Sequence, residues 1–172
     1  LYLNQTNISN LSPLSGLMKL HVLELSQTQV SDFSPLSNLI NLIILNLNNT
    51  KFKDLELLAG LSSLTILNLR QTQVIDLAPL ANLKKLEVLE LNQTLVNDIR
   101  PLSNLKNLEV LNLDQTQVSD LSPLYGLESL STLFINKENH SLEKLAALEE
   151  ALPNTTIIDL KEENTAGGDD SR

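Results

Sequence analysis

The chain has 172 residues, no cysteine and no tryptophan, and its 21 acidic against 12 basic residues give a formal net charge of -9. The length suits one domain, and no apolar run approaches the ~18 residues of a membrane span. The charge argues against duplex nucleic acid or an anionic membrane as partner, and without a long apolar run we expect no membrane insertion. The lack of cysteine excludes disulfides, thiolate metal sites and cysteine nucleophiles.

A threonine recurs every 22 residues, and the residues around it recur with it. The threonines are Thr6, Thr28, Thr50, Thr72, Thr94 and Thr116. A fixed period of this size indicates a solenoid, in which each repeat stacks on its neighbours. Before each threonine, a Leu-x-Leu pair such as Leu67 and Leu69 predicts a short strand with both leucines facing inward. One strand per repeat, always running in the same direction, predicts a parallel sheet.

The second half of each repeat has leucines spaced by three, which is typical of 3₁₀ or short helical turns. A proline opens each turn except in the third repeat, where Leu57 takes its place. Three residues earlier stands a side chain that we expect to cap the turn: Asn10, Asp32, Asp54, Asp76, Asp98 and Asp120. Three positions after the proline position, every repeat has Gly or Asn, which tolerate positive φ. We expect this residue to end each turn in the left-handed conformation. The residues are Gly16, Asn38, Gly60, Asn82, Asn104 and Gly126.

The repeats are predicted to fill residues 1–137, because the frame breaks where Glu138 takes the threonine position. Residues 141–152 have the apolar spacing of an amphipathic helix, and residues 156–158 predict a last edge strand. We therefore expect residues 138–160 to form a divergent capping repeat. The polar, glycine-containing residues 161–172 are expected to form a disordered acidic tail.

The outward positions of the strands offer a candidate binding surface. The first outward position of each strand should face solvent, yet it is apolar in five of six repeats. The equivalent positions further along the strands are mostly polar or acidic. Exposed apolar strips usually mark contacts, while the alternative is that β-branched residues simply favour strands. The candidate partner-binding residues are Val22, Glu24, Ile44, Asn46, Ile66, Asn68, Arg70, Val88, Glu90, Val110, Asn112, Asp114 and Phe134.

Other polar columns are better explained by structure than by chemistry. We interpret Gln5, Gln27, Asn49, Gln71, Gln93 and Gln115 as an amide ladder between repeats, with a ligand surface as the alternative. Each capping Asp is alone in its repeat, whereas calcium takes 6–8 oxygens, and His21 and His140 lie in different regions. The chain shows no nucleophile–base pair and no glycine-rich phosphate loop, so we expect no enzyme, no metal and no cofactor.

The stretch LEVLNLDQTQVSDLSPLYGL resembles the internalin-like, bacterial class of leucine-rich repeats, and LPNTTIIDL is similar to the end of many bacterial members. The resemblance implies an α/β leucine-rich repeat solenoid with a curved parallel β-sheet on the concave face and 3₁₀ or short helical turns on the convex face. Two features depart from it. Threonine replaces the usual asparagine, whose amide ties neighbouring loops together, and the chain has no helical N-terminal cap.

The resemblance and the outward strip together imply a non-catalytic protein–protein interaction module that binds a partner protein through its concave face. The alternatives are an intracellular regulatory subunit, comparable to phosphatase-binding repeat proteins, and a targeting arm of a larger ligase or kinase. Leu1 falls within the repeating frame, so the native start is expected upstream, and a secreted or cell-surface bacterial location is favoured over a cytoplasmic one. Because the first strand has no cap before it, residues 1–20 are expected to fray and the chain to self-associate through that end.

Overall fold

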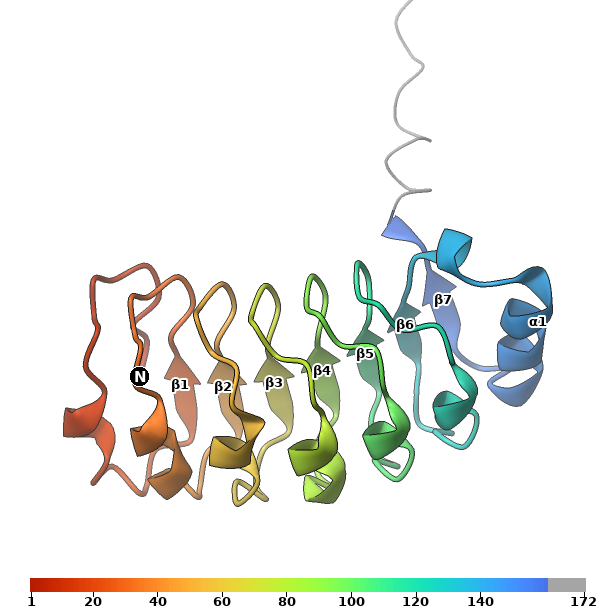
Figure 1. Cartoon of the computed structure of the whole chain (residues 1–172). Helices are drawn as coiled ribbons and strands as arrows, with labels where there is room; N and C mark the ends of the chain where they lie inside the picture. The colour runs from red at the N-terminus through yellow and green to blue at the C-terminus, as the bar shows by residue number, and fades with distance from the viewer. Residues whose placement is uncertain (161–172) are drawn as a thin grey trace, which may run out of the picture.

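Every repeat from the second onward contributes one strand to a single open parallel sheet (Figure 1). The structure is a computed structural model that describes residues 1–160. The strands lie in chain order, and the residues of β1 to β5 each pair with the residue 22 positions on. The predicted leucine-rich repeat solenoid is confirmed. The strands are β1 (Val22–Glu24), β2 (Ile44–Asn46), β3 (Ile66–Asn68), β4 (Val88–Glu90), β5 (Val110–Asn112), β6 (Thr132–Phe134) and β7 (Thr156–Ile158).

Short 3₁₀ turns line the side of the molecule opposite the sheet, as the leucine spacing predicted (Figure 1). Proline occupies the opening of five of them, where its fixed φ and missing N–H are suited to a first turn. These turns are η1 (Ser12–Leu14), η2 (Ser34–Asn38), η3 (Leu55–Leu58), η4 (Ala78–Asn82), η5 (Arg100–Leu102) and η6 (Ser122–Leu124). A further 3₁₀ turn, η7 (Lys137–Asn139), follows β6 and lies outside the leucine-spaced segments.

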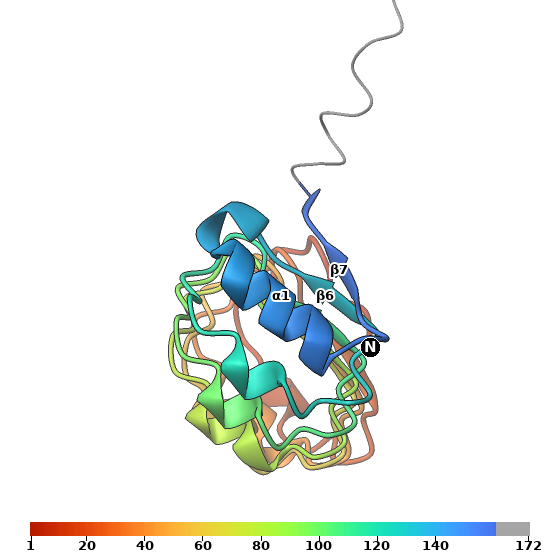
Figure 2. The same ribbon diagram turned by 90° about the vertical axis from the view of Figure 1, so that its right-hand side faces the viewer.

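The C-terminal end of the stack carries the helix α1 (Leu142–Ala151) (Figure 2). Ser141 caps it by accepting a hydrogen bond from the Lys144 backbone N–H at 3.3 Å, and Leu148 of α1 and Leu152 just after it are buried in the core. The division of the chain into repeats over 1–137 and a capping repeat over 138–160 stays a prediction. The expected tail over 161–172 lies outside the described residues.

The core is a stack of identical leucine positions. Leu45, Leu67 and Leu89 pair in register on neighbouring strands, and each is 0% exposed. Because the same positions repeat in every strand, the buried side chains form continuous columns through one hydrophobic core. Phe33 and Phe52 close the loop side of the second and third repeats with an edge-to-face ring contact at 5.1 Å.

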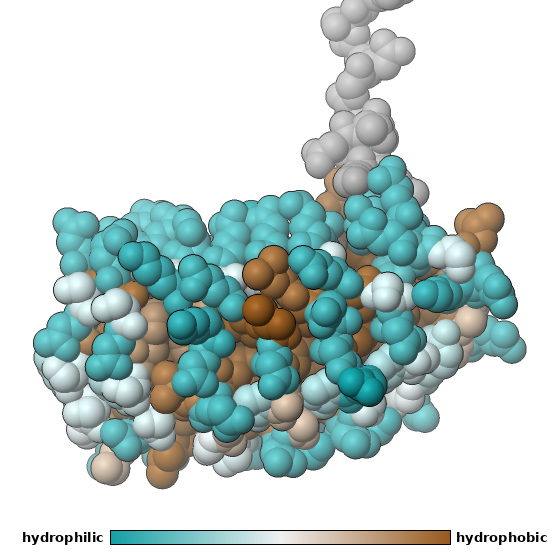
Figure 3. Space-filling model, in the orientation of Figure 1, coloured by the Kyte–Doolittle hydropathy of each residue, from teal (hydrophilic) through white to brown (hydrophobic). Residues whose placement is uncertain are grey.

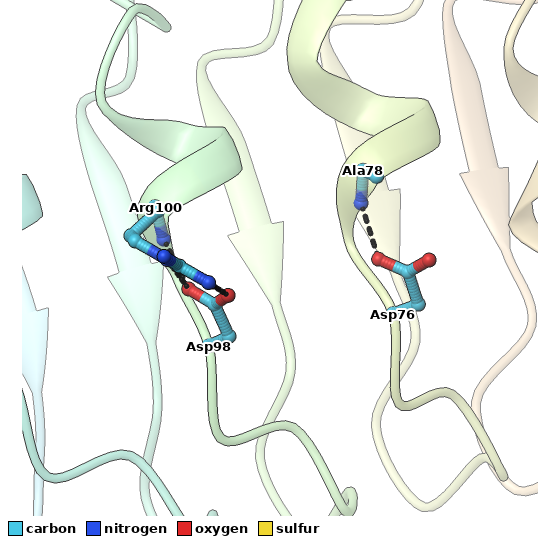
Figure 4. A network of polar contacts seen from close by, with 4 residues as sticks. All are labelled: Asp76, Ala78, Asp98 and Arg100. Carbon is cyan, nitrogen blue, oxygen red and sulfur yellow. Dashed lines mark hydrogen bonds and ion pairs between the residues drawn. The ribbon is translucent and has the colours of Figure 1, made fainter.

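The acidic column caps the turns as expected. Each of the six side chains accepts a hydrogen bond from the backbone N–H two residues ahead. Figure 4 shows two of them, Asp76 with the Ala78 N–H at 2.8 Å and Asp98 with the Arg100 N–H at 2.9 Å. Asp98 also holds the Arg100 guanidinium at 2.6 Å. These bonds satisfy backbone donors that the short turns leave unpaired.

The residues with a positive φ occupy a different position in the repeat from the predicted one. No glycine among residues 1–160 has a positive φ, so the left-handed role predicted for the column that begins at Gly16 is wrong. The turns there continue through successive three-residue hydrogen bonds, such as Leu17 N to Leu14 O and Leu20 N to Leu17 O, which need no left-handed residue. The left-handed residues lie in the loops, three positions after the end of β1 to β5 and after the bridged Tyr2, with φ between 52° and 60°: Gln5, Gln27, Asn49, Gln71, Gln93 and Gln115.

The glutamine and threonine columns serve their own repeats more than their neighbours. Among the described residues, a side-chain bond between members of the glutamine column joins only Gln93 to Gln115, at 3.1 Å, so the predicted amide ladder is largely wrong. Each threonine hydroxyl donates to the leucine carbonyl three residues earlier, as Thr72 does to Leu69 at 2.6 Å. Neighbouring loops are tied by backbone bonds instead, such as Gln71 N to Asn92 O at 3.1 Å.

Replacing Leu67 with aspartate should abolish cooperative melting or lower the melting temperature drastically. The side chain is fully buried in the central layer, and a carboxylate there would lose its hydration without gaining a partner. Circular dichroism during a thermal ramp measures this. A melting curve close to that of the wild type would contradict the 22-residue register.

Thr72→Val should destabilise the protein by ~1–3 kcal/mol, because it removes a buried hydroxyl donor and leaves the Leu69 carbonyl without that bond. Urea denaturation at neutral pH gives the free energy of unfolding. Thr6→Val is the matched control, since Thr6 makes the equivalent bond to Leu3 in an exposed position. An equal loss in both variants would show that burial of the bond does not matter.

The capping aspartates should make stability fall at acidic pH. Backbone N–H donors of Ser34 and Ser122 lower the pKa of Asp32 and of Asp120, and the side-chain hydrogen bond from Arg100 is the main cause that lowers the pKa of Asp98. A depressed carboxyl pKa stabilises the fold above the unfolded-state pKa, about 3.9, and this contribution is lost as pH falls through the folded-state pKa.

The double variant Asp32→Asn, Asp120→Asn should match wild-type stability near neutral pH, because asparagine caps the same turn at Asn10. Its melting temperature should then fall less than that of the wild type below about pH 4. Melting curves recorded across the acidic range test this. Equal acid sensitivity of the two proteins would show that these caps carry no pH-dependent stability.

Candidate functional site

Five apolar side chains form a continuous strip on the outward side of the sheet. We call the outward side of β1–β6 the sheet face, and the strip consists of Val22, Ile44, Ile66, Val88 and Val110. Strand pairing sets each beside the next, and all are half-buried. With strands ~4.8 Å apart, the strip runs for about 19 Å. Thr132 continues the column on β6 with a polar hydroxyl.

The asparagines beside the strip are partly committed to the fold. Asn46, Asn68 and Asn112 each accept a hydrogen bond from the backbone N–H two residues ahead, at 2.9 to 3.0 Å. This bond holds the chain where each strand ends, and the sequence pattern alone did not reveal it. Asn46 also donates to Glu24 across the strands at 2.7 Å. These side chains therefore have less freedom to meet a partner than their outward position suggested.

Two candidate residues offer little surface. Asn112 is 7% exposed and Asp114 is 4% exposed, and Asp114 accepts a hydrogen bond from Gln115 at 3.1 Å. The other candidates are half-buried, except Arg70, which is exposed. Phe134 lies at the β6 end of the face, beyond Asn112. The accessible part of the predicted site is thus the strip with Glu24, Asn46, Asn68, Arg70, Glu90 and Phe134.

A further column lies at the edge where the strands begin, and the prediction did not include it. Its exposed members include Ile43, Glu87 and Glu109, each of which directly precedes a strip residue. Backbone bonds join them in sequence, since Glu109 N donates to the Glu87 carbonyl at 2.8 Å. These residues could have been included in the predicted site from the sequence alone, because residues that flank an apolar strip also lie within reach of a bound partner.

The opposite side of the molecule is mostly hydrophilic, with an apolar patch near its middle (Figure 3). Ile75 and Leu95, which follow the third and fourth strands, are 53% and 51% exposed. Their equivalents in other repeats are polar, including Lys53 and Lys51. An apolar residue in a polar column was the signal that could have identified them.

Residues 1–160 contain no cluster of His, Cys, Asp or Glu that could hold a metal ion. His21 lies at the strand-start edge, while His140 precedes α1, and burial lowers the pKa of His140. Within the same residues no helix is long and apolar enough to cross a membrane.

A family model for two copies of leucine-rich repeats matches residues 84–126. The crystal structure of internalin C2 from Listeria monocytogenes is 34% identical, with a TM-score of 0.80, and the match covers 91% of this chain and 68% of that one. The chain belongs to the internalin-like leucine-rich repeat proteins. No curated protein sequence matches it.

Two further solved structures are similar to this chain. An internalin of Listeria monocytogenes, internalin F, is 29% identical with a TM-score of 0.65, over 91% of this chain and 59% of that one. A leucine-rich repeat protein of Leptospira interrogans shares the fold at 24% identity and a TM-score of 0.80, over 90% of this chain and 41% of that one. The internalin-like chain thus spans about two thirds of its Listeria relatives or less.

Leucine-rich repeat proteins generally act as non-catalytic modules for protein–protein interaction, because their stacked repeats present an extended surface. In this internalin-like chain apolar groups are exposed or half-exposed in several places. The sheet face has five in one line, Ile75 and Leu95 form a pair on the opposite face, and Leu17, Met18 and Ile40 are exposed in the segments before β1 and β2.

Proposed function

We propose that this internalin-like chain is a non-catalytic interaction module that binds a partner protein through its sheet face. The observation that carries the proposal is the unbroken apolar strip from Val22 to Val110. It spans five strands in register, which is a larger continuous apolar surface than the pair Ile75 and Leu95 provides. Continuous apolar surface of this kind marks interaction sites.

Strand propensity alone does not account for the strip. Threonine is also β-branched and favours strands, and Thr132 occupies the same column on β6. A polar, β-branched residue would therefore serve the fold at these positions. Five successive valine or isoleucine side chains instead leave apolar surface half-open to water, which favours a contact role over a structural one.

The surroundings of the strip suit a specific contact. Interfaces combine an apolar centre with a polar rim that orients the partner. Here Glu24, Asn68 and Arg70 lie on one side of the strip, and Glu87 and Glu109 lie on the other. Phe134 adds an aromatic side chain at one end, a type enriched where interfaces are strongest.

The same face would serve the alternative function, in which the repeats are the targeting or regulatory arm of a larger protein. Self-association through residues 1–3 stays a separate prediction. This first segment pairs with β1 through the bridge between Tyr2 and Glu24. Self-association there would use the edge of the sheet rather than the sheet face.

Ile66→Glu and Val88→Glu should each abolish partner capture while leaving the fold intact, because both side chains lie outside the core. A glutamate in the strip would have to lose water on binding without an assured partner, at a cost of several kcal/mol or about a thousandfold in affinity. Pull-down with quantitative mass spectrometry measures capture, and circular dichroism checks the fold.

Ile75→Glu and Leu95→Glu are the matched controls on the opposite face, where both side chains are about half exposed. They should retain every partner that the wild type captures. If instead the strip variants keep all partners and the control variants lose them, the binding site is on the opposite face.

A further inference from the structure

Acidic side chains gather around the β4–β5 part of the strip. Glu87 and Glu109 are exposed at the strand-start edge, directly before Val88 and Val110. Glu90 lies on the other side of Val88, in the next outward column, and is half-buried. Three carboxylates therefore surround two apolar strip residues on adjacent strands.

None of these three carboxylates makes an ion pair or a side-chain hydrogen bond with another residue among 1–160. Lys84 donates to the Ala81 carbonyl at 2.6 Å and Lys106 donates to the Gly126 carbonyl at 2.8 Å. Lys85 is exposed two positions before Glu87 but forms no ion pair with these carboxylates. Like charges on neighbouring strands repel, which is the case for Glu87 and Glu109, and no ion pair within residues 1–160 offsets this repulsion.

Buried acceptors lie near this cluster. The Asn92 side chain follows Glu90 by two positions and is 7% exposed, and its Oδ1 atom has no donor within the described residues, as is also the case for Asn48 after β2. Because these oxygens are buried, the carboxylates are the groups that make this surface complementary to ammonium and guanidinium groups, and the exposed Arg70 on the neighbouring repeat limits that region towards β3.

We infer that the partner meets β4 and β5 with a basic segment whose apolar side chains pack on Val88 and Val110. Its lysine or arginine side chains pair with Glu87 and Glu109 at one edge of the strip and with Glu90 at the other. The inference rests on the proposed function, because it names the chemistry of the partner at that same face. The net charge of -9 speeds the encounter with such a partner by attraction over a longer range.

Other occupants fit this surface less well. A nucleic acid would bring phosphates against the carboxylates. A second copy of the same face would place Glu87, Glu90 and Glu109 against their own equivalents, and such like-charge contacts cost several kcal/mol. A purely apolar segment would leave the three carboxylates to lose water without compensation.

Three fluorescent peptides of equal length test the inference, with sequences that alternate lysine and valine, glutamate and valine, or lysine and serine. Fluorescence anisotropy titrations at low and at physiological salt give the affinities. The lysine–valine peptide should bind most tightly, and added salt should weaken its binding. The triple variant Glu87→Gln, Glu90→Gln, Glu109→Gln should bind it about tenfold more weakly.

The matched control is Glu56→Gln, Glu128→Gln, Glu149→Gln, which removes the same charge from exposed positions outside the sheet face. Its affinity for the lysine–valine peptide should stay within about twofold of the wild type. Equal weakening in both triple variants would show that only overall charge matters, and it would overturn the inference. Equal binding of the lysine–serine peptide would do the same.

Tighter or equal binding of the glutamate–valine peptide, or no binding of the lysine–valine peptide, would also overturn the inference. Those results would leave the proposed function open to its own test, since the Ile66→Glu and Val88→Glu variants report on partner capture whatever the partner's charge. Loss of capture in the strip variants, with full capture by the glutamine variant, would place the partner on the strip without basic contacts.

Discussion

Parallel pairing of each strand with the residue 22 positions further on is the constraint on which the rest of this structure depends. A single repeat cannot cover its own leucines, so each must lie against the equivalent leucines of its neighbours. The pairing turns every sequence position into a column of side chains, and a one-residue slip would expose the whole leucine set. Stability and surface chemistry are therefore both properties of columns rather than of single residues.

The polar columns divide into those whose side chains make hydrogen bonds within a repeat and those whose side chains are exposed without such a bond in most repeats. Threonine and aspartate bond within their own repeat, and the asparagines of the second outward column hold the ends of their strands. These tasks are local, so the same residue type recurs. The strand-start column has no task common to all repeats, since Ser131 donates to the Glu109 carbonyl at 3.0 Å while Ile43 and Glu87 make no side-chain hydrogen bond among the described residues. Variation where the fold makes no demand is where recognition can be encoded.

The sheet face is consequently uneven along the stack. Its apolar strip is nearly constant from β1 to β5, whereas unpaired carboxylates concentrate at β4 and β5 and Arg70 stands alone after β3. In the proposed function, the uniform strip provides contact area and the uneven charge pattern selects where along the strip a partner docks.

The sequence by itself determined the repeat register, the strands, the 3₁₀ turns and the aspartate caps, because each depends on residues only a few positions apart and recurs in phase. It also placed the strip outward, since side chains alternate along a strand. The tertiary structure alone decided the left-handed position at Gln71, the partner of Thr72 and the burial of Asn112 and Asp114. The first two lie within one repeat, where a recurring residue type does not specify the backbone angle or which carbonyl a hydroxyl reaches. The burial of Asn112 and Asp114 depends on how one repeat lies against the next, and spacing along the chain does not report the distance between stacked side chains.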